Sequence, residues 1–289
     1  MPEIKRALLI VNLHKENAPV LAEKITGELG KKNIEVTAFT YEGASEFDPR
    51  PGYDVCFSLG GDGTVLYAAR TVAPRGTPIL PINLGSLGFI AGVSPDEWAE
   101  VFDRWSGGEA LISPRLMLEI TVERRGRIAA RSACLNDAVI SASGIAKLIR
   151  LQVASETALP GDHIRIGHFR SDGLIVATPT GSTAYSAAAG GPILDPEIEA
   201  VIINPICPFT LSNRPMVVPA HETITVEVEA EQRSGVLLTA DGQITEPLEP
   251  KDRIFIQKAP YQALLIASDR EVFYRVLRSK LNWSGGPHA

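Results

Sequence analysis

Leu59-Gly60-Gly61-Asp62-Gly63-Thr64 lies directly after an apolar run and directly before a run of helix-forming residues. The apolar run, residues 55–59, is typical of a short buried strand, and residues 64–70 favour a helix. The glycines therefore occupy a strand-to-helix turn, where we expect positive φ angles and close approach of a ligand because no Cβ is present. Unpaired N–H groups at the start of the helix would face that ligand, which favours phosphate.

Asp62 is the unexpected residue of this turn, because a carboxylate repels phosphate. Its presence is explained if it accepts a proton from an attacking hydroxyl, or if it holds a hydrated Mg²⁺ between phosphates. Both explanations indicate phosphoryl transfer. The alternative is a plain glycine turn in which Asp62 caps the helix.

Two common phosphate-binding signatures are absent from the sequence. No G-x-x-x-x-G-K-[ST] occurs, so the turn is not a P-loop. Leu66 stands where a G-x-G-x-x-G dinucleotide fingerprint starting at Gly61 would have its third glycine. The turn therefore needs an explanation other than these two signatures.

The composition is ordinary for a globular protein, with 45% hydrophobic and 21% charged residues in a chain of 289. The net charge of −6 and the isoelectric point near 5.5 argue against nucleic acid as a partner. Cys56, Cys134 and Cys207 show no zinc-binding spacing and fit a reducing compartment. The first apolar run is too short for a signal peptide or a membrane span, so we expect a cytoplasmic protein without membrane contact.

Strands and helices alternate in the first part of the chain. Residues 7–11, 34–39, 55–59 and 77–83 are expected as strands, and residues 18–31 as a helix. This alternation predicts an α/β domain with a parallel sheet over residues 1–110, with its ligands at the carboxyl ends of the strands. Asp62 follows such an end.

The pattern changes after residue 110. Short strands are expected at 118–123, 128–140, 148–153, 163–167, 223–230, 236–240, 253–257 and 261–267. They predict a mostly antiparallel β domain over residues 111–267. Ser268 and Glu271 then form a capping-box pattern. It opens a helix, about 268–283, that is expected to return to the first domain.

A second glycine-rich stretch interrupts the β domain: Thr178-Pro179-Thr180-Gly181-Ser182-Thr183-Ala184-Tyr185. Small hydroxylated residues and glycine allow a ligand to approach closely, and Tyr185 offers a flat ring for stacking on a base. The alternative is an irregular loop around a core tyrosine. Clusters so rich in Thr, Ser and Gly have little use in building a core, which favours a binding segment.

With these motifs the sequence resembles the NAD kinase family over nearly its whole length. The resemblance rests on the residues 60–64, Leu135-Asn136-Asp137, Asp172-Gly173, the stretch 178–185, Gly190-Gly191-Pro192, Leu211-Ser212-Asn213-Arg214-Pro215, Ala240-Asp241-Gly242-Gln243 and the closing 277–283. The first motif is shared with diacylglycerol, sphingosine and phosphofructokinase-type kinases, whereas the stretch 178–185 is far more specific.

The resemblance implies transfer of the terminal phosphoryl of ATP, or of polyphosphate in some members, to the 2′-hydroxyl of the adenosine ribose of NAD. Asp62 would accept the hydroxyl proton, and Gly60, Gly61 and Thr64 would form the phosphate loop. Mg²⁺ or another divalent cation would accompany the donor, without a metal site built from protein ligands. The partners are therefore NAD and ATP.

The resemblance also assigns substrate contacts. Asn136 and Asp137 would hydrogen-bond the substrate, Thr183 to Tyr185 would hold the adenine side, and Asp172 would bind elsewhere on the dinucleotide. Arg170 would meet phosphate charge. The remaining substrate-binding residues are Gly63, Lys147, Ala184, Ser186 and Gln243, while Asp241 would contact or support the site.

Three positions depart from the family pattern. Asp137 stands where Glu is usual, Ala188 replaces a usual Ser, and Phe209 stands where His is common. Asp137 reaches one methylene less far and Ala188 offers no hydroxyl, yet Asp62 is retained.

Two alternative functions stay open: a lipid kinase that shares only the first motif, and a non-catalytic NADP(H)-binding sensor. A homodimer or homotetramer with contacts through the β domain is expected from the family.

Overall fold

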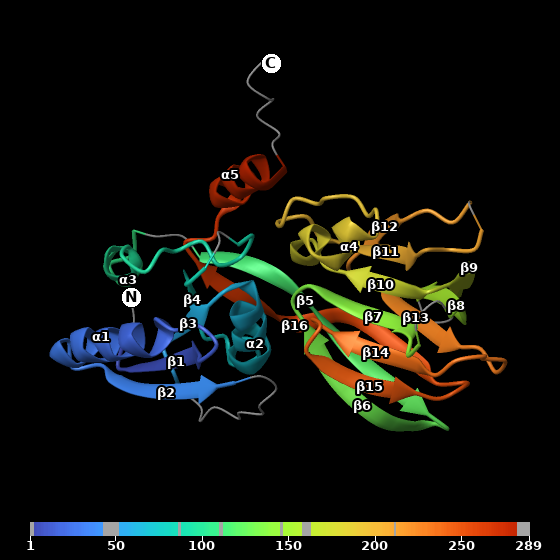
Figure 1. The fold of residues 1–289 in the computed structure, drawn as a ribbon, viewed down its shortest axis with the longest axis horizontal. Helices are drawn as coiled ribbons and strands as arrows, with labels where there is room; N and C mark the ends of the chain where they lie inside the picture. Colours follow the sequence, from blue (N-terminus) through green and yellow to red (C-terminus); the bar gives the residue numbers. More distant parts are fainter. Residues whose placement is uncertain are drawn as a thin grey trace, which may run out of the picture. The chain divides into compact units, whose positions relative to one another are not determined.

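The structure is a computed structural model that describes residues 3–42, 52–85, 88–109, 112–144, 147–157, 163–210 and 212–281 (Figure 1). The chain divides into two compact units, Met1–Arg115 with Tyr261–Ala289, and Leu116–Pro260. Among the helices of the described residues, none has both the length and the hydrophobicity that crossing a membrane requires.

The first unit is an α/β domain on a parallel sheet of order β2-β1-β3-β4, continued by the last residues of β16. Its strands are β1 (Arg6–Asn12), β2 (Glu35–Tyr41), β3 (Val55–Gly60), β4 (Ile79–Asn83) and the end of β16 (Arg253–Ile266). Its helices are α1 (Ala18–Lys31), α2 (Asp62–Val72), α3 (Trp98–Ser106) and α5 (Arg270–Leu281). Gly60 pairs with Asn83, so the glycine turn lies at the carboxyl end of the sheet.

Successive buried side chains of a strand point to opposite faces of the sheet, and helices cover both faces. Leu9 of β1 belongs to a buried cluster with Ile25 of α1 and Phe102 of α3. Leu8 is also fully buried but points to the opposite face, because successive side chains of a strand alternate. Helix α2 contacts β1, β3 and β4 and covers that face. Both faces of the parallel sheet are therefore apolar.

The second unit contains two groups of antiparallel strands. One sheet has the order β12-β11-β10-β7-β14-β15, and the other joins β16, β13, β8 and β9, with β5 paired to β16 and β6. The strands are β5 (Ile112–Arg124), β6 (Arg127–Cys134), β7 (Asp137–Ala142), β8 (Ile149–Glu156), β9 (His163–Ser171), β10 (Gly173–Ala177), β11 (Ala200–Ile206), β12 (Met216–Pro219), β13 (Thr223–Val228), β14 (Val236–Ala240) and β15 (Ile244–Leu248). A 3₁₀ turn (Thr180–Thr183) and the short α4 (Tyr185–Ala188) follow β10.

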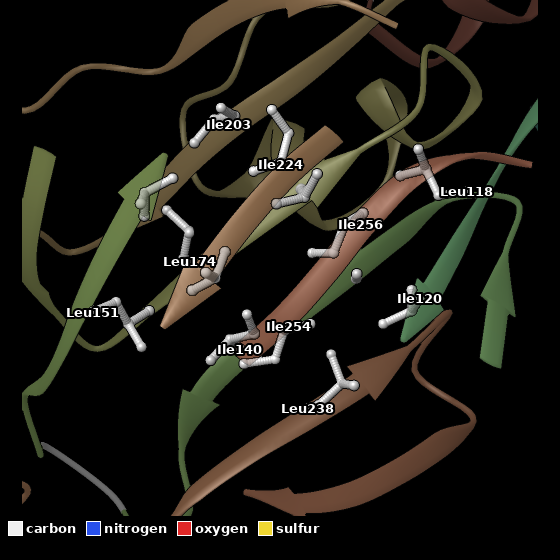
Figure 2. Close-up of a cluster of buried hydrophobic side chains, with 14 of the residues drawn as sticks. Leu118, Ile120, Ile140, Leu151, Leu174, Ile203, Ile224, Leu238, Ile254 and Ile256 are labelled. Carbon is white, nitrogen blue, oxygen red and sulfur yellow. The ribbon is translucent and has the colours of Figure 1, made fainter. Parts of the chain in front are cut away.

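The core of the second unit lies between these two sheets. Figure 2 shows Ile140 and Leu174 of one sheet together with Ile224 and Ile256 of the other. All four side chains are at most 1% exposed. Burial of apolar surface stabilises the folded state by about 25 cal/mol per Å² and is the main source of stability for a β domain of this kind.

The predicted fold class is confirmed: an α/β domain with a parallel sheet, a mostly antiparallel β domain and a C-terminal helix that belongs to the first unit. Two element predictions were wrong. The stretch 128–140 is not one strand but β6 and β7, separated at Leu135 and Asn136. The stretches 253–257 and 261–267 are one strand, β16, which continues through Pro260.

The predicted capping box before α5 was also wrong. The N–H of Val272 donates to Oδ1 of Asp269 at 3.0 Å, so Asp269 supplies the cap. The hydroxyl of Ser268 instead donates to the carbonyl of Ile90 at 3.5 Å.

Candidate functional site

The glycine turn begins where β3 ends at Gly60, and α2 begins at Asp62. None of Gly60, Gly61 and Gly63, all three described, has a positive φ, so that expectation was wrong. The turn needs Gly60 for space instead, because a Cβ there would lie 2.0 Å from Oγ1 of Thr64. A Cβ on Gly61 would meet no atom within 4 Å, which leaves room for a ligand above the turn.

Thr64 is held from two neighbouring strands. Nδ2 of Asn12 donates to Oγ1 of Thr64 at 3.3 Å, and the hydroxyl of Tyr41 donates to the same oxygen at 3.1 Å. The ring of Tyr41 stacks on Tyr67 with centroids 4.9 Å apart. Burial raises the pKa of Tyr41, so the phenol keeps its proton and remains a donor. The carboxyl ends of β1 and β2 therefore fix the threonine of the turn.

The carboxylate of Asp62 is oriented by main-chain N–H groups of a distant segment. Phe89 donates to Oδ2 at 2.9 Å, while Ile90 and Ala91 donate to Oδ1 at 3.2 and 2.9 Å. Asp62 makes no side-chain cap of α2, whose N-cap residue is Gly61. A carboxylate offers about four lone-pair positions, two on each oxygen. Among the described residues Oδ2 receives one N–H, so this oxygen keeps a position for a further donor.

In the second unit a cavity of about 380 Å³ lies over the start of β7. It is lined by Asn136, Asp137, Val139, Ser141, Ala184, Tyr185, Thr239, Asp241 and Gly242. Positions 137, 139 and 141 share one face of β7, because strand side chains alternate. The cavity therefore follows the strand and suits an elongated ligand. It brings together four of the predicted substrate-binding residues: Asn136, Asp137, Ala184 and Tyr185.

Asp241 supports this cavity. Its carboxylate accepts the N–H groups of Leu135 and Asn136 at 3.1 and 2.7 Å, and its own N–H donates to the carbonyl of Asp137 at 2.9 Å. Asp241 has a φ of 52°, a conformation that Asp tolerates better than most residues. These bonds replace sheet pairing at residues 135 and 136, which explains why the predicted strand 128–140 is broken there.

Asn136 presents an acceptor that the described protein does not satisfy. Its Oδ1 atom is buried without a hydrogen-bond partner. A buried carbonyl without a donor costs about 1–3 kcal/mol. The carboxyl of Asp137 beside it is also buried. The cavity therefore suits a ligand that brings hydrogen-bond donors, as hydroxyl groups or an exocyclic amine would.

The stretch 178–185 is built against the same loop. The hydroxyl of Thr178 donates to the carbonyl of Leu135 at 2.5 Å, and its N–H donates to the carbonyl of Asn136 at 2.8 Å. Gly181 packs on the main chain of Asn136. Tyr185 is 48% exposed, so it is not a core tyrosine and its ring is available to a ligand.

Two predicted residues, one within this stretch and one directly after it, do not line the cavity. Ser186 is fully buried, and Nδ2 of Asn204 donates to its carbonyl and hydroxyl oxygens at 2.9 and 3.2 Å. The hydroxyl of Thr183 donates to the carbonyl of Thr180 at 3.2 Å. Both hydroxyl groups are therefore hydrogen-bonded within the protein and support the segment.

Gly63 lies in the first unit, in the first turn of α2. The remaining predicted substrate contacts lie elsewhere in the second unit. The guanidinium of Arg170 lies over the ring of Phe209 at 4.6 Å from its centroid, and Lys147 and Gln243 are exposed. The carbonyl of Asp172 accepts the N–H of Ala142 at 3.0 Å, at the carboxyl end of β7, whereas Asp137 begins this strand. Five residues of strand correspond to about 16 Å. A ligand that contacts both ends of β7 must therefore be extended.

Val139, Ser141, Thr239 and Gly242 line the cavity but were not predicted. The alternation of residues 137, 139 and 141 could have identified two of them once Asp137 was placed at a strand start. Thr239 lies opposite Val139 in the β7–β14 pairing, which is a long-range relation that local pattern does not reveal.

Asp137 should make stability depend on pH. Burial, and then the charge of Asp241, raise the pKa of its carboxyl to about 7. A raised folded-state pKa gives stability that is complete below the ordinary pKa near 3.8 and is lost as pH rises through about 7. At about pH 8.5 the free energy of unfolding of Asp137→Asn, measured by denaturant titration, should therefore exceed that of the parent by on the order of 2–4 kcal/mol. Near pH 4 the free energies of unfolding of the two proteins should be almost equal. An equal difference at both pH values would contradict this.

Comparison with known proteins identifies the family. A model of the ATP-NAD kinase N-terminal domain matches residues 14–110, and one of the ATP-NAD kinase C-terminal domain matches residues 135–268. The NAD kinase of Treponema denticola is 41% identical over 283 residues, 98% of each chain. The NAD kinase of Syntrophotalea carbinolica is 39% identical and covers 97% of this chain and 99% of its own.

Solved structures agree. An NAD kinase from Archaeoglobus fulgidus in complex with ATP has a TM-score of 0.71 and 27% identity, covering 97% of this chain and 100% of that one. Yeast NADH kinase complexed with NADH has a TM-score of 0.80 at 24% identity, covering 99% and 90%, and shows the shared fold. Because both domain models match and relatives are about 40% identical over almost the full length, this chain belongs to the NAD kinase family.

Proposed function

We propose that this protein is an NAD kinase that transfers the terminal phosphoryl of ATP to the 2′-hydroxyl of the adenosine ribose of NAD, giving NADP and ADP. The observation that carries the proposal is the carboxylate of Asp62. It stands at the carboxyl end of a parallel sheet, where ligands of such sheets bind, and it is oriented by three main-chain N–H groups. Membership of the NAD kinase family supports this reaction.

In the proposed reaction Asp62 accepts the proton of the 2′-hydroxyl through the open position on Oδ2. The hydroxyl oxygen forms a bond to the terminal phosphorus, and the bond from that phosphorus to the ADP oxygen breaks. A secondary hydroxyl is a poor nucleophile, and a carboxylate within hydrogen-bond reach removes the proton as the new bond forms. Gly60 and Gly61 leave space at the turn for the phosphates.

The cavity on β7 is the proposed site for the adenosine part of NAD. Asn136 offers a buried acceptor and Asp137 a buried carboxyl, which suit ribose hydroxyls or the adenine amine. The exposed ring of Tyr185 would stack on the base. Asp172, at the other end of β7, would contact the far end of the extended dinucleotide. Three further side chains are proposed to contact the bound substrate: those of Arg170, Lys147 and Gln243.

A divalent cation, Mg²⁺ or another, is proposed to arrive with the donor. The described residues contain no group of three or more His, Cys, Asp or Glu side chains placed to hold a metal. Mg²⁺ usually keeps several waters and binds substrate phosphates, so it can accompany ATP without a site built from protein ligands. The cation would neutralise donor charge that Asp62 otherwise opposes. Polyphosphate is the alternative donor.

A cytoplasmic location and a homodimer or homotetramer are further parts of the proposal. Cys56, Cys134 and Cys207 are all free thiols, as expected in a reducing compartment. Met216 and Val217 on the edge strand β12 are 42% and 48% exposed, an apolar edge that a second copy would cover. Light scattering at micromolar concentration would show a monomer if the oligomer proposal is wrong.

A coupled assay tests the function. The purified protein is mixed with NAD, Mg²⁺ and either ATP or polyphosphate, and NADP is detected with an NADP-specific dehydrogenase. We expect product with ATP. Dinucleotide binding without product from either donor would indicate a sensor, and phosphorylation of a lipid but not of NAD would indicate a lipid kinase. Either result would overturn the proposal.

A further inference from the structure

The segment 88–92 determines where the carboxylate of Asp62 points. Three consecutive N–H groups, of residues 89–91, donate to its two oxygens. Gly88 lies directly against it, because a Cβ at this position would be 1.9 Å from Oδ1. The main chain of Asp62 belongs to α2, but its functional group is fixed by residues that come 27 to 29 positions later.

The C-terminal helix contacts this segment through side chains. The rings of Phe89 and Phe273 lie 6.3 Å apart between centroids at an angle of 48°. Nζ of Lys280 lies 5.0 Å from the centroid of the Phe89 ring. A Cβ on Gly92 would be 3.1 Å from Cγ1 of Val272. Helix α5 therefore contacts Phe89, the first residue that donates to Asp62, and Gly92, which directly follows the last donor.

The residue before α5 is fixed as well. Ser268 donates its hydroxyl to the carbonyl of Ile90, and Nη2 of the buried Arg115 donates to the carbonyl of Ser268 and to its hydroxyl oxygen. Phe273 itself is 3% exposed. A buried arginine and a buried aromatic ring thus secure the start of α5 against the segment that orients Asp62.

We propose that α5 is a positioning element for the reaction, in which Phe273 acts through Phe89 and the main chain of residues 89–91 to hold the carboxylate of Asp62. The inference rests on the proposed role of Asp62 as proton acceptor. Because proton transfer requires hydrogen-bond reach, a shift of the segment by a fraction of an ångström to 1 Å reduces the rate of the chemical step without removing any substrate contact.

The first test is a double-mutant cycle between Phe89→Ala and Phe273→Ala, read as kcat and KM for NAD. We expect each single variant to lower kcat by about 10- to 100-fold with KM within about threefold of the parent. The double variant should be no slower than the slower single variant, because both remove the same contact. Losses that multiply in the double variant, or a change in KM alone, would overturn the proposal.

A second test asks whether the effect passes through Asp62. Phe273→Ala is added to Asp62→Asn, and the residual turnover of the two is compared. We expect no further loss, because there is no longer a proton acceptor to position. A further loss by the factor seen in the parent background would show that Phe273 acts in another way.

Leu277→Ala is the matched control. Leu277 is also buried on α5 but makes none of the contacts with residues 88–92 described above. We expect Leu277→Ala to lower the melting temperature as Phe273→Ala does but to keep kcat within about twofold of the parent, since a cavity costs stability. An equal loss of kcat would overturn the proposal, because general loosening of α5 would then explain it.

Two further variants keep the proposal testable if Phe273→Ala is difficult to interpret or does not fold. Phe273→Leu should restore most of the kcat lost in Phe273→Ala, and failure to restore it would contradict a packing role. If Phe273→Ala does not fold, Phe89→Ala gives the same readout, because Phe89 is only partly buried. Failure of the inference is distinct from failure of the proposed function: the parent protein would still phosphorylate NAD in the first case and not in the second.

Discussion

Asp62→Asn is expected to lower kcat for NAD phosphorylation by about 10²- to 10⁴-fold, the usual contribution of a general base. The asparagine keeps the size of the side chain but cannot take the hydroxyl proton. KM for NAD should stay within about threefold of the parent, because the proposed NAD contacts lie on β7 and the 178–185 stretch. Steady-state kinetics with saturating ATP and Mg²⁺ measure both constants.

The geometry around Asp62 requires a control for folding. Asparagine can place its carbonyl where Oδ1 accepts two N–H groups, but its amide then faces the N–H of Phe89, at a cost of about 1–3 kcal/mol. Asp54→Asn is the matched variant. Oδ2 of Asp54 also accepts two main-chain N–H groups, of Lys5 and Arg6 at 2.8 Å each, at the amino end of β1.

We expect Asp54→Asn to lose stability in the same way while its kcat remains that of the parent. Turnover of Asp62→Asn within about threefold of the parent would remove the proposed base. A melting curve for each variant shows whether a loss of activity reflects unfolding. The pair therefore separates loss of a proton acceptor from loss of a structural carboxylate.

The sequence was sufficient to predict the parallel sheet and the place of Asp62. The buried run of β3 and the helix pattern after it are local signals, and a carboxylate after a strand end must lie at the carboxyl edge of the sheet. What orients Asp62 was not predictable. Its three donors are main-chain N–H groups, which every residue type except proline carries, so no side-chain pattern marks residues 89–91.

The break between β6 and β7 shows the same limit. Residues 128–140 have the composition of one strand, and the break depends on Asp241, more than a hundred positions later. A carboxylate that accepts N–H groups of Leu135 and Asn136 competes with strand pairing there. Likewise, Asp269 caps α5 because Ser268 is engaged by Ile90 and Arg115, which are tertiary contacts. Local propensity therefore identified the extended stretch 128–140 and helix α5. Long-range hydrogen bonds determined where the stretch breaks and where the helix begins.

Gly181→Ala is expected to disrupt the cavity on β7. A Cβ at this position would lie 2.1 Å from the carbonyl oxygen of Asn136 and 2.7 Å from its Cα. Main chain cannot move aside as a flexible side chain does, so the loop that carries Asn136 and Asp137 must shift. We expect KM for NAD to rise by at least about tenfold and stability to fall by about 1–3 kcal/mol, the usual cost of overpacking.

Gly167→Ala is the matched control in the same unit. A Cβ at Gly167 would have its nearest contact at 3.8 Å from Cε2 of Phe169, an ordinary van der Waals distance. This variant should retain the KM and stability of the parent. In Gly181→Ala, kcat at saturating NAD should fall less than kcat/KM, because Asp62 is not altered. If Gly181→Ala binds NAD as the parent does, the loop of Asn136 and Asp137 does not form the dinucleotide site, and NAD must bind elsewhere on the chain.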